Sequence, residues 1–137
     1  MATALSDIER VDFVTAREYF RYIQQIVTEA HHVIDSNLQF TEVYIHECYI
    51  RGVLTLRNGF KLHVAEYSIT EPSINRLKYR YQLLSATNAM TVRWDNASHH
   101  PEIDSFPHHR HDSDGTIHAS PPMGLPAVLY TIVPYLV

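Results

Sequence analysis

The segment GVLTLRNGFKLHVAEY, residues 52–67, carries the clearest fold signal in the sequence. Two runs rich in β-branched, aromatic and leucine residues flank Asn58-Gly59. An Asn-Gly pair in this position is the strongest short signal for a β-hairpin, because both central residues of a type I′ turn need positive φ. A loop of two residues would pair Arg51 with Glu66 across the hairpin. We therefore expect a hairpin here, in that register.

A second hairpin is predicted from residues 77–85 and 90–95, joined by a loop of four residues at 86–89. This loop length sets four cross-strand pairs, two apolar on one face and two polar on the other: Leu83 with Val92, Tyr81 with Trp94, Gln82 with Arg93, and Arg80 with Asp95. One face of the sheet should therefore be core and the other polar. A strand near residues 40–50 completes the sheet.

Two helices are predicted on either side of this sheet region. In residues 13–36 apolar positions recur at steps of three and four, which is typical of an amphipathic helix. Thr15 followed by Glu18 has the capping-box spacing, and Ser6 followed by Glu9 offers the same signal earlier, so the start of the helix stays open. Residues 126–135 form a short helix with proline in its first turn, which we expect to pack on the core.

The fold class that follows is α+β in one domain, residues 1–137: an antiparallel sheet of four to five strands, residues 40–95, packed on one long N-terminal helix, with a short C-terminal helix. Residues 96–122 lack periodicity and are expected to form a histidine-rich loop. Within it, residues 112–122 are the expected mobile tether to the last helix.

Composition excludes several classes of protein. The net charge of −4 argues against a broad duplex DNA-binding surface, which would need many Lys and Arg residues. The single cysteine, Cys48, cannot form an internal disulfide, and we expect it to be a small core residue. The N-terminus does not resemble a secretory signal, and the apolar residues 123–137 are too short to cross a bilayer. We therefore expect a cytoplasmic protein without a membrane partner.

The candidate catalytic groups lie in residues 95–111. Six of the ten histidines fall in residues 96–122, and histidine next to carboxylates supplies the acid and base for proton transfer near neutral pH. The candidate acid/base groups are Asp95, His99, His100, His108, His109 and His111. Arg93, Arg80 and Arg110 are the candidate substrate-binding residues, because a guanidinium binds phosphate through two parallel hydrogen bonds. Such a site would cleave RNA, whose 2′-hydroxyl is a built-in nucleophile.

Other interpretations remain open at this point. No cofactor is predicted, but His100, His109 and His111 could instead hold a divalent metal such as zinc, in a hydrolase or a regulatory protein, although their spacing matches no standard zinc module. The loop could also be a polar segment without chemistry. A third interpretation is a non-enzymatic interaction module, in which the N-terminal helix and the apolar residues 123–137 form a partner or homodimer surface. Glu66 is explained structurally by its predicted partner Arg51.

The strings RWDNASHHPE, residues 93–102, and SFPHHRH, residues 105–111, resemble the TumE family of small prokaryotic proteins. The resemblance covers roughly residues 52–111. It implies a single-domain cytoplasmic toxin of a type II toxin–antitoxin pair, held inactive by a cognate antitoxin protein, and it supplies no settled reaction. The first functional hypothesis is therefore a toxin that acts on RNA as a ribonuclease-like hydrolase or phosphotransferase, with its assignment as an enzyme still open.

Overall fold

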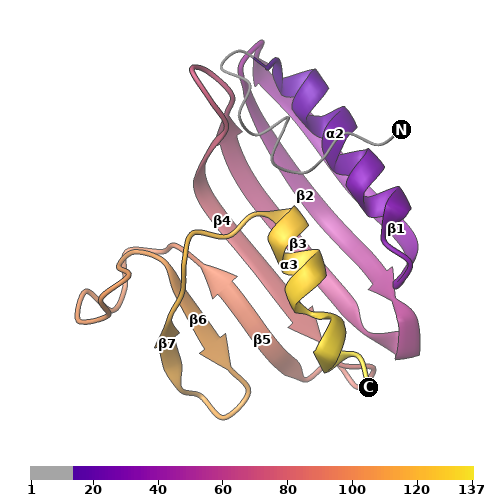
Figure 1. Cartoon of the computed structure of the whole chain (residues 1–137), viewed down its shortest axis with the longest axis vertical. Helices are drawn as coiled ribbons and strands as arrows, with labels where there is room; N and C mark the ends of the chain where they lie inside the picture. Colours follow the sequence, from indigo (N-terminus) through magenta and orange to yellow (C-terminus); the bar gives the residue numbers. More distant parts are fainter. Residues whose placement is uncertain (1–13) are drawn as a thin grey trace.

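The computed structural model describes residues 14–137, and within them one antiparallel sheet of seven strands carries two α-helices on one face (Figure 1). The strands lie in chain order: β1 (Val33–Tyr44), β2 (Glu47–Leu56), β3 (Lys61–Ile69), β4 (Asn75–Leu84), β5 (Met90–Asp95), β6 (His109–Asp112) and β7 (Ile117–Ala119). The helices are α2 (Ala16–Glu29) and α3 (Leu125–Thr131). The α+β class is confirmed, but the predicted four to five strands are too few.

Helix α2 begins at Ala16, after one of the two predicted caps, Thr15, and ends before the predicted residue 36. The alternative cap at Ser6 lies outside the described residues. Thr15 is the N-cap, and its side chain and that of Glu18 each accept a hydrogen bond from the other's backbone amide, which completes the capping box. The predicted helix 13–36 is too long: α2 has 14 residues, and residues 33–36 begin β1. There the backbone pairs with β2, and this pairing overrides the apolar periodicity. Residue 13 lies outside the described residues.

Loss of the capping box is expected to destabilise the fold measurably. A Thr15→Ala variant should lose about 0.5–2 kcal/mol of unfolding free energy, because the first-turn amides lose their acceptor. Urea denaturation followed by circular dichroism measures this change. Thr28→Ala is the matched control in the same helix, because the exposed Thr28 hydroxyl bonds only the Gln24 carbonyl. Equal losses of unfolding free energy in both variants would contradict a stabilising role of the Thr15 cap.

The first hairpin is confirmed, but its predicted register is wrong. The loop contains three residues, Arg57–Gly59, and closes with the Leu56 amide donating to the Phe60 carbonyl at 2.8 Å. Asn58 and Gly59 both have positive φ, as the Asn-Gly signal predicts. The longer loop shifts the pairing by one residue, so Arg51 faces Ala65 and not Glu66.

This one-residue shift sends Glu66 into the core, because neighbouring strand residues point to opposite faces. Its carboxylate is 2% exposed. It accepts hydrogen bonds from the Tyr81 hydroxyl at 2.6 Å, the Ser68 hydroxyl at 2.8 Å and the Tyr19 hydroxyl, and Arg76 lies 3.7 Å away. The predicted pairing of Glu66 with Arg51 is therefore replaced by a buried polar network that ties α2 to the sheet.

The second hairpin has the predicted register at all four pairs. The prediction of a loop over residues 96–122 is partly wrong, because this segment contains β6 and β7. The expected mobile segment 112–122 instead starts with a turn between these strands, in which the Asp112 amide donates to the Thr116 carbonyl and Gly115 has positive φ. Main-chain pairing with β5 stabilises β6 despite its polar sequence.

The core lies between the sheet and the two helices. Leu54, Leu62 and Leu83 of the sheet are fully buried, and Val128 of α3 and Ile132 just after it belong to the same core cluster. The predicted C-terminal helix 126–135 is observed as α3 followed by a 3-10 turn at Val133–Tyr135, and it packs on the core as expected. Cys48 is also buried, and burial raises its pKa to about 12. In the described part of the chain no helix is long and apolar enough to span a membrane.

Candidate functional site

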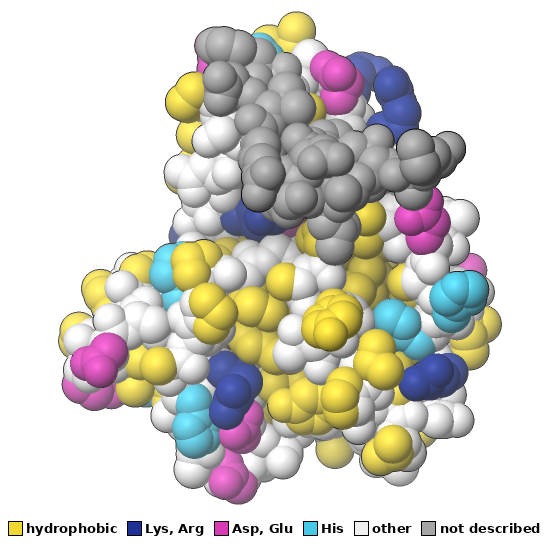
Figure 2. Space-filling model, viewed as in Figure 1, with side chains coloured by type: hydrophobic (Ala, Val, Ile, Leu, Met, Phe, Trp, Pro, Cys, Tyr) yellow, Lys and Arg dark blue, Asp and Glu magenta, His cyan; other side chains and the backbone are white. Residues whose placement is uncertain are grey.

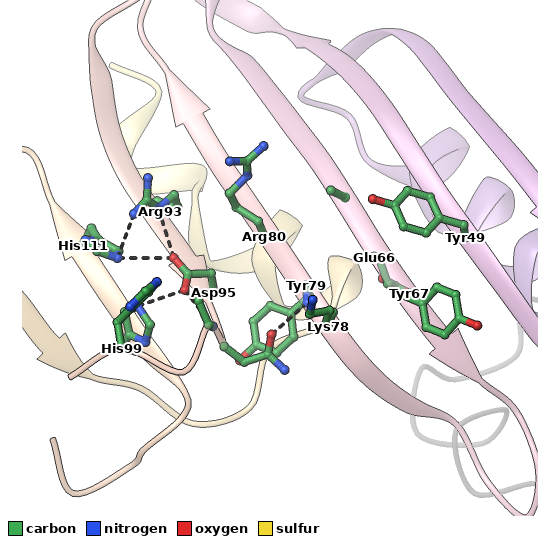
Figure 3. Close-up of a pocket in the computed structure, with 14 residues that line it drawn as sticks. Tyr49, Glu66, Tyr67, Lys78, Tyr79, Arg80, Arg93, Asp95, His99 and His111 are labelled. Carbon is green, nitrogen blue, oxygen red and sulfur yellow. Dashed lines mark hydrogen bonds and ion pairs between the residues drawn. The ribbon is translucent and has the colours of Figure 1, made fainter. Parts of the chain in front are cut away.

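A polar cluster occupies the face of β5 and β6 that points away from the helices (Figure 3). The register places Arg93 opposite His111 and Asp95 opposite His109. Because residues directly opposite each other in a sheet point to the same side, all four side chains converge. Arg93 and Asp95 lie on β5, where the predicted register of the second hairpin places them on this face. Strand β6 supplies His109 and His111.

Asp95 is the centre of this cluster, and its carboxylate is buried. Its Oδ2 accepts a hydrogen bond from Arg93 Nε at 3.1 Å and lies 3.3 Å from His111 Nε2. Its Oδ1 lies 2.9 Å from His109 Nε2 and accepts a hydrogen bond from the Ala97 amide at 3.0 Å. Asp95 therefore fixes the positions of one guanidinium and two imidazoles.

His109 has both ring nitrogens engaged and is 2% exposed. Its Nδ1 lies 2.9 Å from the Pro107 carbonyl, which can only accept, so Nδ1 carries a hydrogen. The close contact of Nε2 with Asp95 Oδ1 then needs a hydrogen or a metal ion between the two atoms. His109 lies in the wall of the cavity but is almost fully buried, so we interpret it as a residue that positions Asp95.

His111 is the member of the cluster that is suited to accept a proton. Burial, and then the positive charge of Arg93, lower its pKa, so the ring is neutral near pH 7. Arg93 Nη2 donates a hydrogen bond to its Nε2 at 2.9 Å, so in the neutral ring Nε2 is the accepting nitrogen and Nδ1 carries the hydrogen. The side chain is 16% exposed, which leaves it open to the cavity described below.

His99 and His100 approach the cluster from the loop that follows β5. The His100 ring lies edge-on to the rings of His109 and His111, with centroids 5.6 and 6.2 Å away. His100 Nδ1 contacts Glu102 at 3.2 Å, which leaves Nε2 available. His99 lines the cavity and packs edge-on to His100 at 6.4 Å.

Two of the predicted site residues lie on the other face of the sheet. His108 stacks on Tyr79 and shares a hydrogen bond of 2.7 Å with its hydroxyl, on the side covered by the helices. Burial lowers the pKa of His108. Arg110 makes two hydrogen bonds to the Asp112 carboxylate. The alternation of β6 therefore separates His108 and Arg110 from His109 and His111.

A cavity of about 390 Å³ opens beside the cluster and extends over β3 and β4 towards β2. Arg80, predicted as a substrate-binding residue, lines it opposite Asp95. Sequence reasoning missed Tyr49, Tyr67 and Lys78, which line its far end. The signal was available in the alternation of the strands, because Tyr49 and Tyr67 fall between buried positions of β2 and β3, and Lys78 directly precedes the first buried residue of β4.

Asp95, His109 and His111 form a group that could hold a metal ion, because their ligand atoms all lie within 4.8 Å of one another. The predicted metal set included His100 in place of Asp95. His100 lies beside this group but outside it. Arg93 now contacts two of the three groups, so a metal would require its guanidinium to move away.

Comparison with known proteins gives one match. A family model described as Toxin TumE matches residues 20–133. This range extends beyond residues 52–111, where the sequence motifs carry the resemblance, and includes most of α2 and all of α3. No curated protein and no solved structure matches the chain significantly.

Proposed function

We propose that this chain, which belongs to the TumE toxin family, inhibits growth by cleaving RNA at the cluster of Arg93, Asp95, His100 and His111. Membership of this family makes it the toxin component of a toxin–antitoxin pair, with a cognate antitoxin as its partner. The observation that carries the proposed reaction is the neutral His111, held between Arg93 and Asp95 on an open face.

His111 is the proposed general base. Once Arg93 Nη2 has turned from it to the bound phosphate, His111 Nε2 would take the proton from the 2′-hydroxyl of a bound nucleotide. The resulting oxygen nucleophile would attack the adjacent phosphorus. A general base must be in its neutral, proton-accepting form at the operating pH. The lowered pKa of His111 meets this condition.

His100 is the proposed general acid. Its Nε2 would donate a proton to the 5′-oxygen as the bond between phosphorus and that oxygen breaks, leaving a 2′,3′-cyclic phosphate and a 5′-hydroxyl. Arg93 would bind the phosphate through Nη1, which has no partner in the described part of the chain. Each proton taken by His111 is thus matched by one given by His100, and no other reactant is needed.

A metal-dependent hydrolase is the second candidate, and the convergence of Asp95, His109 and His111 favours it. The hydrogen bond from His109 Nδ1 to the Pro107 carbonyl is the kind of contact that orients a metal-binding imidazole. In this reading a metal such as zinc would supply an activated water, and His100 would lie beside it.

One experiment distinguishes these proposals. Protein purified without an affinity tag and dialysed against EDTA is incubated with single-stranded oligouridine, alone and with added zinc. We expect cleavage in EDTA, a 2′,3′-cyclic phosphate at the new end, and no cleavage at a position that carries a 2′-deoxy sugar. Cleavage that needs zinc, or that ignores the deoxy substitution, would replace the first proposal by the second. Absence of cleavage in both conditions would reject both.

A further inference from the structure

The face of the sheet that carries the histidine cluster continues, uncovered by helices, across β2, β3 and β4. The strand registers arrange its side chains in rows that run across the sheet. One row contains Tyr49, Tyr67 and Lys78. The next contains Arg51, Ala65, Arg80 and Asp95, and the third leads through Gln82 to Arg93 and His111. The rows therefore connect two tyrosines and several cations to the proposed catalytic groups.

This face is locally basic although the whole chain has a net charge of −4. Arg51, Lys78 and Arg80 are exposed on it, and Arg93 is partly exposed. The two acidic residues that line the cavity do not offset this charge, because Asp95 is paired with Arg93 and the histidines, and the Glu66 carboxylate is bonded within the core. Figure 2 shows the opposite side, where hydrophobic side chains gather around α3 and Lys and Arg are scattered.

Two aromatic side chains lie at the end of the cavity away from the histidines. The rings of Tyr49 and Tyr67 are half-buried and lie edge-on with centroids 6.0 Å apart. The Tyr67 hydroxyl donates a hydrogen bond to Glu47, which fixes its ring, and the Arg51 guanidinium lies 5.6 Å from the Tyr49 ring centroid. Figure 3 shows both tyrosines and Lys78 on the same face as Arg80, Arg93 and His111.

We propose that this face binds single-stranded RNA, with bases stacked on Tyr49 and Tyr67 and phosphates passing Lys78 and Arg80 to Arg93. We call these five residues the RNA track. Open sheet faces with aromatic side chains bind unpaired bases in other proteins, because stacking needs a base without a partner strand. Four strand spacings separate β2 from β6, about 19 Å, which accommodates a few nucleotides. This inference rests on the proposed function and adds that the RNA is single-stranded and lies along this face.

Single-stranded RNA fits this face better than duplex nucleic acid. A duplex is held mainly by many phosphate contacts over a wide basic surface. Here the cations form a narrow group beside a concave cavity of about 390 Å³, with tyrosines at one end. An acidic protein segment could also pair with the positive side chains, but it would have no bases to stack on the aromatic rings.

The test measures binding separately from cleavage. A fluorescent 2′-O-methyl oligouridine cannot be cleaved through its 2′-oxygen, so its affinity for the wild-type protein is measured directly. We expect Tyr67→Leu to weaken binding by about 5- to 150-fold, the range for loss of one base stack. Lys78→Ala should lower the slope of log affinity against log salt by about 0.7, as expected for one lost phosphate contact on a single strand. Thermal melting confirms that each variant is folded.

Arg17→Ala is the matched control, because it removes one positive charge from an exposed side chain on α2, on the opposite face. It should leave both affinity and salt slope unchanged. Equal binding by wild type, Tyr67→Leu and Lys78→Ala would overturn the RNA track even if oligouridine is cleaved. Binding that depends on these residues without any cleavage would keep the track and reject the proposed reaction. Polyglutamate that binds in the same residue-dependent way, with no binding of oligouridine, would assign the face to an acidic protein partner instead.

Discussion

A His111→Ala variant is expected to cleave RNA about 100- to 10,000-fold more slowly than the wild-type protein, which is the usual contribution of a positioned general base. The variant removes the only proposed proton acceptor and leaves Arg93 and Asp95 in contact with each other. In cells the same variant should no longer inhibit growth. Initial rates on oligouridine and colony counts after induction measure the two effects.

His118→Ala is the control for this variant. His118 lies on the neighbouring strand β7, opposite Arg110, and contacts Asp112 at 3.1 Å on the face away from the cluster. Its loss should change neither cleavage nor toxicity. A folded His111→Ala protein with full cleavage activity would show that another group is the base.

The pH profile supplies a further readout for the same residue. Because burial and Arg93 lower the pKa of His111, its neutral form persists below pH about 6.5, and the rate should fall only as pH drops through that lowered pKa. In Arg93→Gln the repelling positive charge is gone, so the pKa rises and the acid limb should move to higher pH. An unchanged acid limb in Arg93→Gln would contradict the role of Arg93 in setting this pKa.

The largest effect on stability is expected at Arg76. The Glu66 carboxylate is buried, and Arg76 provides its positive partner at 3.7 Å while donating a hydrogen bond to the Tyr19 hydroxyl at 3.0 Å. Removing one partner of a buried ion pair leaves an uncompensated charge, which costs about 3–5 kcal/mol. Arg76→Met should therefore lower the unfolding free energy by this amount, measured by urea denaturation.

The double variant Arg76→Met with Glu66→Gln tests whether the uncompensated charge of Glu66 causes this loss of stability. It removes the buried negative charge as well, while the glutamine can still bond the hydroxyls of Tyr19 and Tyr81. The double variant should therefore be more stable than Arg76→Met alone. If it is equally or less stable, the loss comes from the packing of the arginine chain and not from the charge.

The buried charge of Glu66 also contributes to the raised pKa of the neighbouring tyrosines. Burial, and then the negative charge of Glu66, raise the pKa of Tyr19 and of Tyr81 well above the usual value. Both hydroxyls therefore keep their protons and donate to the carboxylate. This network was hidden in the sequence, because the one-residue difference in the length of the first hairpin loop decides which face Glu66 occupies.

The prediction was most successful where the signal is local. The Thr15 cap, both hairpins and the register of the second hairpin follow from neighbouring residues and from the length of a short loop. That register alone places Arg93 and Asp95 on the polar face. The first hairpin shows the limit of such reasoning, because the Asn-Gly signal identifies the turn but does not distinguish a loop of two residues from one of three.

The sequence by itself determined the α+β class, the histidine-rich stretch and the polar face that carries Arg93 and Asp95. Only the tertiary structure decided which histidines lie together. Strand β6 exists through backbone hydrogen bonds to β5, which are formed between distant residues and leave no apolar alternation in its own sequence. Once it forms, its alternation sends His109 and His111 to the side of Asp95 and sends His108 and Arg110 to the other side.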